Sequence, residues 1–216
     1  MPAEDNVALT IVAMADTHGF HDDLAVHDGD VLIHAGDMCR SGSLDELAIA
    51  RDFLAALPHP HKIVVAGNHD RAFERQPEEA RRLFADFVYL QDEARTVEGV
   101  TFYGSPWTPW YLDWSFNLPR GEPLAEKWAM IPDDTDVLVT HGPPRGIGDD
   151  AGEVQWREGC ADLLRRVQEV APRLHVFGHI HRMRGQWRIG PTTFVNATTD
   201  ECLKPVTVIR YPPEIR

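Results

Sequence analysis

Five short apolar runs recur along this chain, and each of them ends directly in polar side chains. The runs are continuous rather than alternating, which is typical of strands that are covered on both faces. They occupy residues 11–15, 31–35, 62–66, 137–140 and 174–177. This pattern predicts an α/β fold in which buried strands deliver polar groups to their carboxyl ends.

A helix is expected between the second and third of these strands. Ser43 and Glu46 form the capping-box pattern that starts a helix, and Pro58 ends it. Apolar residues recur between them at helical spacing, at Leu47, Ala50, Leu54 and Leu57. Strand, helix and strand in this order form a βαβ unit, so we expect the two strands to pair in parallel.

The rest of the chain continues the mixed pattern. We expect helices near 78–86, 122–130 and 160–171, a short strand at 87–90, hairpins at 96–103 and 186–196, and a last strand at 206–209. Residues 104–121 are rich in aromatic side chains but have no helical or strand period, and a loop of this length is usually functional. Because no repeat or linker interrupts the chain, we expect residues 1–216 to form a single domain.

Charge and cysteine usage narrow the class of protein. The chain carries 34 acidic and 21 basic residues, a formal net charge of -13, which argues against indiscriminate binding to nucleic-acid backbones. The three cysteines are scattered, so neither a disulfide framework nor a zinc ribbon is indicated. The first residues are acidic where a signal peptide would be basic, and no apolar run approaches the ~18 residues of a membrane span. We expect a cytoplasmic protein without a membrane partner, and we leave a homo-oligomer open.

The polar residues at the strand ends have the chemistry of metal ligands. Ligands of an α/β sheet bind outside the carboxyl ends of its strands, so residues far apart in sequence can converge there. Carboxylates, imidazoles and an amide oxygen without thiolate suit manganese, iron or zinc, and so many ligands fit two divalent ions bridged by one carboxylate. Such a pair of ions activates water against a phosphoryl group. The expected ligands are Asp16, His18, Asp37, Asn68, His141, His179 and His181.

Each of these residues also has an ordinary structural interpretation. Asp37, Asp70 and Asn68 could serve turns, and a histidine is usually a surface or core residue. We keep that interpretation for the other histidines, at positions 21, 27, 34, 59, 61 and 175. At the strand ends we favour the metal site, because four strand ends would otherwise have to imitate ligand spacing by chance.

Five blocks of sequence, in this order, resemble the signature of the calcineurin-like metallophosphoesterases. They are Asp16-x-His18, Gly36-Asp37, Gly67-Asn68-His69-Asp70, His141 and Gly178-His179-x-His181. The resemblance spans residues 16–181, and every ligand position of the pattern is occupied. It implies a four-layer α-β-β-α sandwich, with two mixed sheets face to face and helices outside.

The resemblance also implies a role for each residue of the site. The attacking group would be a metal-bound hydroxide. His69 would stabilise the transition state or protonate the leaving oxygen, with Asp70 orienting its imidazole. Asp37 would bridge the two ions, one of them held by Asp16, His18 and His181, the other by Asn68, His141 and His179.

Substrate contacts are expected from two further stretches. Residues 104–110 and 140–144 resemble the branch of the family whose characterised members are cyclic-nucleotide phosphodiesterases. Four aromatic side chains could stack a nucleobase near the metals: Trp107, Trp110, Tyr111 and Trp114. The loop could equally be a packing core or a dimer contact. Arg145, in the Gly/Pro-rich loop after His141, could meet a substrate phosphate, although the interpretation as a solvated loop arginine is favoured.

The sequence thus predicts an enzyme with two divalent ions that hydrolyses small phosphodiesters such as 3',5'- or 2',3'-cyclic nucleotides. A phosphomonoesterase or protein phosphatase remains the main alternative, because the same centre serves both reactions. A non-catalytic nucleotide-binding or scaffold module is the third, and loss of the metal ligands or of His69 would favour it. The partner expected of the enzyme is a small phosphate ester.

Overall fold

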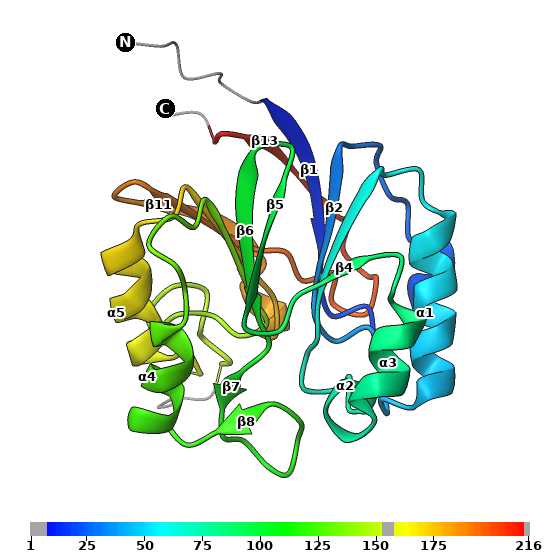
Figure 1. Cartoon of the computed structure of the whole chain (residues 1–216), viewed down its shortest axis with the longest axis horizontal. Helices are drawn as coiled ribbons and strands as arrows, with labels where there is room; N and C mark the ends of the chain where they lie inside the picture. Colours follow the sequence, from blue (N-terminus) through cyan, green and yellow to red (C-terminus); the bar gives the residue numbers. More distant parts are fainter. Residues whose placement is uncertain (1–7, 153–157, 214–216) are drawn as a thin grey trace.

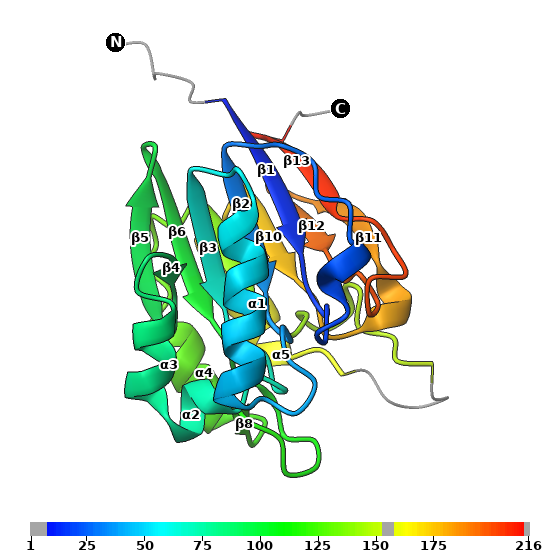
Figure 2. The ribbon, with the colours of Figure 1, turned by 90° about the vertical axis from the view of Figure 1, so that its right-hand side faces the viewer.

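The computed structural model of this chain describes residues 8–152 and 158–213. Two sheets lie face to face in the middle, and helices cover their outer faces (Figures 1 and 2). The expected four-layer sandwich with two mixed sheets is therefore confirmed. Within the described ranges, no helix is long and apolar enough to cross a bilayer.

The first sheet has five strands in the order β13-β1-β2-β3-β4. Its inner strands pair in parallel, and β13 pairs antiparallel to β1 at one edge. The strands are β1 (Leu9–Met14), β2 (Val31–Ala35), β3 (His61–Val65), β4 (Val88–Tyr89) and β13 (Thr207–Tyr211). Parallel pairing of β2 and β3 across helix α1 (Leu44–Ala56) confirms the expected βαβ unit.

The second sheet has six strands in the order β11-β12-β10-β9-β6-β5. Its four inner strands are parallel, while β5 and β11 form the antiparallel edges through the two expected hairpins. The strands are β5 (Glu93–Val97), β6 (Val100–Ser105), β9 (Val137–Thr140), β10 (Leu174–Phe177), β11 (Gly185–Ile189) and β12 (Thr192–Asn196). Both sheets therefore present the carboxyl ends of several parallel strands at one end of the sandwich.

Among the described residues, three helices cover the first sheet and two cover the second, on opposite sides of the molecule (Figure 1). The first group is α1, α2 (Ala72–Arg75) and α3 (Pro77–Leu83), and the second is α4 (Glu122–Ala129) and α5 (Ala161–Val170). Single 3-10 turns, η1 (His21–Asp23) and η2 (His181–Met183), follow β1 and β10. The short helix α2 is not expected from the sequence, because four residues are too few to show a helical period.

Strand β1 shows why the apolar runs are continuous. Ile11, Ala13 and Ala15 face the second sheet and pack in the core between the two sheets. Val12 and Met14 face the other way and pack in the core beneath the helices. Because both faces of the strand are buried, the sequence needs apolar residues at every position rather than at every second one.

Helix α1 begins as the capping box predicts, and its first turn also fixes the preceding loop. The Ser43 hydroxyl accepts from the Glu46 N–H at 3.2 Å. The Glu46 carboxylate accepts from the N–H groups of Arg40, Ser41 and Gly42 at 3.2, 2.8 and 2.8 Å. The loop between β2 and α1 is thereby held against the first turn of α1.

The aromatic loop has little regular structure. This loop, residues 104–121, begins at the end of β6, and beyond Ser105 its strand pairing among the described residues is between β7 (Thr108–Pro109) and β8 (Asn117–Leu118), two residues each. The loop is attached to the site below it, since the Ser115 N–H donates to the Asn68 carbonyl at 3.3 Å. Trp110, Tyr111 and Leu112 project into solvent at its tip.

Candidate metal centre

The polar clusters meet because five parallel strands end side by side. β1, β2 and β3 bring theirs from the first sheet, and β9 and β10 bring theirs from the second. The two sheets are joined at this point by the Ala15 N–H, which donates to the Ala197 carbonyl at 3.1 Å. In three overlapping groups, ligand atoms lie within 4.8 Å of one another: Asp16, His18 and His181; His18, Asp37 and His69; Asp37, His141 and His179.

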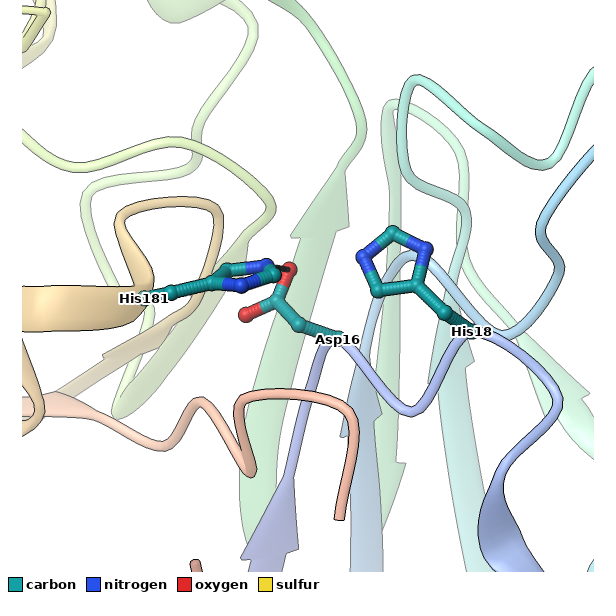
Figure 3. A group of neighbouring side chains, drawn as sticks. All are labelled: Asp16, His18 and His181. Carbon is teal, nitrogen blue, oxygen red and sulfur yellow. Dashed lines mark ion pairs between the residues drawn. The ribbon is translucent and has the colours of Figure 1, made fainter. Parts of the chain in front are cut away.

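The first group is built from two distant segments (Figure 3). Asp16 and His18 follow β1, and His181 comes from η2 after β10. His181 Nε2 lies 3.7 Å from Asp16 Oδ1, and the ring centroids of His18 and His181 are 5.4 Å apart. The Asp16 carboxylate also accepts from the His179 N–H at 3.0 and 3.1 Å, which fixes its direction.

Asp37 lies at the middle of the cluster. Its Oδ2 is 3.3 Å from His141 Nε2 and 3.8 Å from His18 Nε2, so one carboxylate faces ligands of both sheets. Its Oδ1 accepts from the His69 N–H at 2.7 Å. This placement is the one expected of a carboxylate that bridges two ions.

The donor set around His141 fits a divalent cation. His141 Nδ1 lies 3.0 Å from the Ala35 carbonyl and must donate to it, so Nε2 is the nitrogen that faces the cluster. Two oxygens approach Nε2, Asn68 Oδ1 at 2.8 Å and Asp37 Oδ2 at 3.3 Å. The Asn68 amide nitrogen is buried without a partner among the described residues, so its carbonyl oxygen is the atom committed to the cluster. Imidazole, carboxylate and amide oxygen together suit manganese, iron or zinc.

The buried carboxylates and imidazoles shift one another's pKa values. Burial alone would lower the pKa of His141, but the charges of Asp37 and Asp16 outweigh it and raise that pKa to about 9. Burial would raise the pKa of Asp37, and the neighbouring imidazoles of His141, His18 and His69 reverse this and hold it far below its usual range. Burial, with His141 nearby, lowers the pKa of His179 to about 4, which leaves its lone pair free for a metal. The carboxylates are therefore ionised and one imidazole is neutral at pH 7.

Two glycines of the motifs are needed for close approach. A Cβ at Gly36 would lie 2.4 Å from His141 Nδ1, and a Cβ at Gly67 would lie 2.2 Å from Asp37 Oδ1. A Cβ essentially never makes a nonbonded contact this short, so each glycine allows a ligand from another strand end to come near: His141 of the second sheet at Gly36, and Asp37 of the neighbouring strand at Gly67. The glycine in each Gly-Asp or Gly-Asn motif is therefore needed because a larger residue would collide with a ligand of the cluster.

His69 lies at the edge of the cluster, half-buried, and its imidazole is oriented by the backbone. His69 Nδ1 is 2.8 Å from the Arg40 carbonyl, in the loop that Glu46 fixes. The expected contact between Asp70 and this imidazole is wrong. The Asp70 carboxylate instead accepts from the N–H groups of Asp37, Gly67 and Cys39 at 2.9, 2.8 and 2.9 Å, so it holds the backbone that carries Asp37.

The expected substrate contacts have different surroundings. Trp107 donates its indole N–H to the Asp92 carboxylate at 2.8 Å, and Lys127 Nζ lies 4.4 Å from its ring centroid, so this ring is engaged in packing. Trp110 is 64% exposed, and Arg145 is exposed as well. The aromatic ring that contacts the site is Trp114, 4.9 Å from His69 between ring centroids.

One acidic residue beside the cluster could not be predicted from any motif in the sequence. Asp200 Oδ1 lies 3.0 Å from His181 Nδ1. It follows β12 in a polar turn with neither an apolar period nor a motif, and it lies beyond residues 16–181, where the motif blocks end. Only the folded chain brings it beside the last ligand.

Comparison with known proteins agrees with this geometry. The sequence profile of the calcineurin-like phosphoesterases matches residues 9–183. The chain is 41% identical to metallophosphoesterase domain-containing protein 1 of Homo sapiens, over 94% of this chain and 67% of that protein. It is 40% identical to UPF0046 protein K07C11.7 of Caenorhabditis elegans, over 91% and 71% of the two chains. The crystal structure of TT1561 from Thermus thermophilus shares the fold, with a TM-score of 0.60, 13% identity and coverage of 94% and 98%. The chain therefore belongs to the calcineurin-like phosphoesterase family.

Proposed function

We propose that this phosphoesterase is a phosphodiesterase that hydrolyses small phosphodiesters such as 3',5'- or 2',3'-cyclic nucleotides with two divalent metal ions. The observation that carries the proposal is the pair of ligand groups, Asp16, His18 and His181 on one side and Asp37, His141 and His179 on the other, which lie side by side at the strand ends. A centre of this kind would bind both non-bridging oxygens of a phosphoryl group.

The residues divide between the two proposed ions by their position. Asp37 faces both groups and would be shared. Asn68 would complete the second group, since its Oδ1 lies beside His141 Nε2. The metals would supply the Lewis acidity that activates water and neutralises the phosphoryl charge. The identity of the proposed ions is manganese, iron or zinc, according to the donor atoms.

His69 would act on the leaving oxygen. Its Nδ1 is committed to the Arg40 carbonyl, so Nε2 is the nitrogen open to the substrate. When Nε2 carries a proton it can donate to the leaving oxygen, and the ring can then receive a proton from solvent because it is only half-buried. Asp70 would contribute indirectly, by fixing the backbone of the bridging carboxylate.

The ester substituent would lie against the aromatic loop. The leaving group must be near His69, and Trp114 is the ring beside it, with Tyr111 in a T-shaped contact at 5.3 Å. Stacking on such rings contributes ~1 to 3 kcal/mol per base. We keep Trp110 and Arg145 as proposed contacts at the exposed rim and assign Trp107 to packing. The proposed location of the protein is the cytoplasm. Its cysteines, Cys39, Cys160 and Cys202, are unpaired, which supports this location.

The direct test compares bis(p-nitrophenyl) phosphate with p-nitrophenyl phosphate. Protein stripped with EDTA and reloaded with manganese should hydrolyse the diester, and the EDTA-treated protein should not. Activity on the monoester alone would make the chain a phosphomonoesterase. No activity on either compound, with manganese shown to be bound, would contradict the proposal and favour a binding module.

A further inference from the structure

We propose that Asp200, supported by Lys204, is a positioning residue that aims His181 at its metal and strengthens this half of the centre. The inference rests on the metal centre proposed above and concerns only the group of Asp16, His18 and His181. Asp200 belongs to the turn after β12, and none of the motif blocks includes it.

The contact selects the form of His181 that can bind a metal. Asp200 Oδ1 is 3.0 Å from His181 Nδ1, and an ionised carboxylate can only accept, so Nδ1 carries the proton. Nε2 is then the nitrogen with the free lone pair, and it is the one that faces Asp16 Oδ1 at 3.7 Å. Without Asp200, His181 would be free to adopt the opposite tautomer or to turn toward solvent, since its side chain is 32% exposed.

A carboxylate at this position differs from the partners of the other histidines. His18 Nδ1 and His141 Nδ1 meet the backbone carbonyls of Cys39 and Ala35, each at 3.0 Å. A carbonyl is a neutral acceptor, whereas the charge of Asp200 makes the imidazole of His181 a more basic ligand. The group that contains His181 should therefore hold its ion more tightly than the geometry of its three ligands alone would give.

Lys204 holds the carboxylate in place. Its Nζ lies 3.1 Å from Asp200 Oδ2 and donates to the His181 carbonyl at 2.7 Å. One ammonium group thus binds the positioning residue and the backbone of the ligand that it positions. Asp200 and Lys204 are each only 31% exposed, so this contact is partly shielded from solvent.

The turn that contains Asp200 has a strained backbone, and a hydrogen bond connects this turn to the site. Three successive residues, Asp200, Glu201 and Cys202, have φ of 52°, 56° and 63°, a left-handed conformation that residues other than glycine rarely adopt. The Glu201 N–H donates to the Asp16 carbonyl at 2.9 Å. The turn therefore links His181, which follows a strand of the second sheet, to Asp16, which follows a strand of the first.

The test is manganese binding to the full chain, with the number of ions and their affinities measured by titration calorimetry and elemental analysis. Asp200→Asn keeps the shape but loses the charge, and Asp200→Ala loses the contact. One of the two ions should bind 10–100-fold more weakly to Asp200→Ala, and less so to Asp200→Asn, while the other ion binds as before. Nitrogen-15 shifts of the His181 ring in the metal-free protein should show the loss of the Nδ1–H tautomer in Asp200→Ala.

A matched control is Glu98→Gln, which removes a similar carboxylate from His61 Nε2 at 2.9 Å, at the opposite end of β3. It should leave both affinities unchanged. Wild-type affinities in Asp200→Ala, or an equal loss for both ions in Asp200→Asn, would overturn the inference and leave the metal centre standing. A wild-type protein that binds no manganese would overturn the centre and the inference together.

Discussion

Four of the expected ligands have a left-handed backbone. The φ angles are 56° at Asp16, 45° at His18, 57° at Asp37 and 69° at His179. This conformation costs about 1–3 kcal/mol for a residue other than glycine. Hydrogen bonds hold these residues in place, among them the Asp37 N–H to Asp70 and the His179 N–H to Asp16. These left-handed residues lie in the turns that follow the strands, where the ligand atoms come together.

Asp37 is the central carboxylate of the cluster, so its substitution should reduce both manganese binding and turnover, whereas substitution of His69 should reduce turnover alone. Asp37→Asn should lower turnover of bis(p-nitrophenyl) phosphate by at least ~100-fold, since even partners behind the ligands are worth 10–100-fold, and should also lower the bound manganese. His69→Ala should keep the manganese and lower kcat by about 10²- to 10⁴-fold. Elemental analysis beside steady-state kinetics distinguishes the two. Full turnover in Asp37→Asn would contradict the bridging role.

The high pKa of His141 predicts that metal uptake releases a proton. Since that pKa is raised to about 9, His141 is protonated at pH 7 in the metal-free protein, and its Nε2 must lose the proton before it can bind an ion. Affinity should rise roughly tenfold per pH unit up to about pH 9 for the ion held by His141. Calorimetric titration with manganese in two buffers of different ionisation enthalpy measures the protons released. Identical heats in both buffers at pH 7 would contradict this.

At the level of elements, the sequence identifies strands better than it pairs them. Continuous apolar runs mark β1, β2, β3, β9 and β10 correctly, because burial on both faces leaves that signature. Their assignment to two sheets, and the antiparallel pairing of β13 with β1, depend on contacts between residues about 200 positions apart, which no local pattern records.

The site residues, too, are predictable where the signal is local in sequence and are missed or misassigned where it is not. Ligands at strand ends are predictable because the strand and the polar residue adjoin in sequence. Asp70 is misassigned because a neighbour in sequence after a sharp turn points elsewhere, toward the backbone of Asp37. Asp200 is missed because its contact with His181 arises from a turn without a motif.

The aromatic loop should affect substrate affinity through one ring. Trp114→Ala should raise KM for bis(p-nitrophenyl) phosphate on the order of tenfold, as expected for the loss of one stacking contact. It should raise KM for methyl p-nitrophenyl phosphate by a similar factor, because both diesters would place the same aromatic leaving group beside His69. Trp107→Phe is the matched variant. This substitution removes the hydrogen bond from the indole N–H to Asp92 and should lower the thermal midpoint without a comparable change in KM. A larger KM effect in Trp107→Phe would reverse the two assignments.

On the scale of the whole molecule, the candidate metal centre lies at one end of a sandwich whose sheets otherwise pack through apolar side chains. Valine, isoleucine and phenylalanine side chains of both sheets meet in the core between them. At the strand ends the contact is polar, and Asp16, Asp37 and Asp70 are buried there within one cluster. Divalent ions would offset the repulsion among these carboxylates and would connect ligands of the first sheet with His141, His179 and His181 of the second.

Metal binding should therefore stabilise the fold as well as supply the chemistry. An ion at 100 times its Kd adds ~2.7 kcal/mol to the free energy of unfolding, and in a chain of 216 residues this raises the thermal midpoint by about 5–10 °C. The measurement is thermal unfolding of EDTA-stripped protein with and without manganese. Asp37→Asn should show a smaller rise at equal manganese, because it loses the carboxylate shared by the two ligand groups. If wild-type protein binds manganese but its midpoint does not move, the ions bind the unfolded chain equally well, and the site cannot be the preformed junction of two sheets described above.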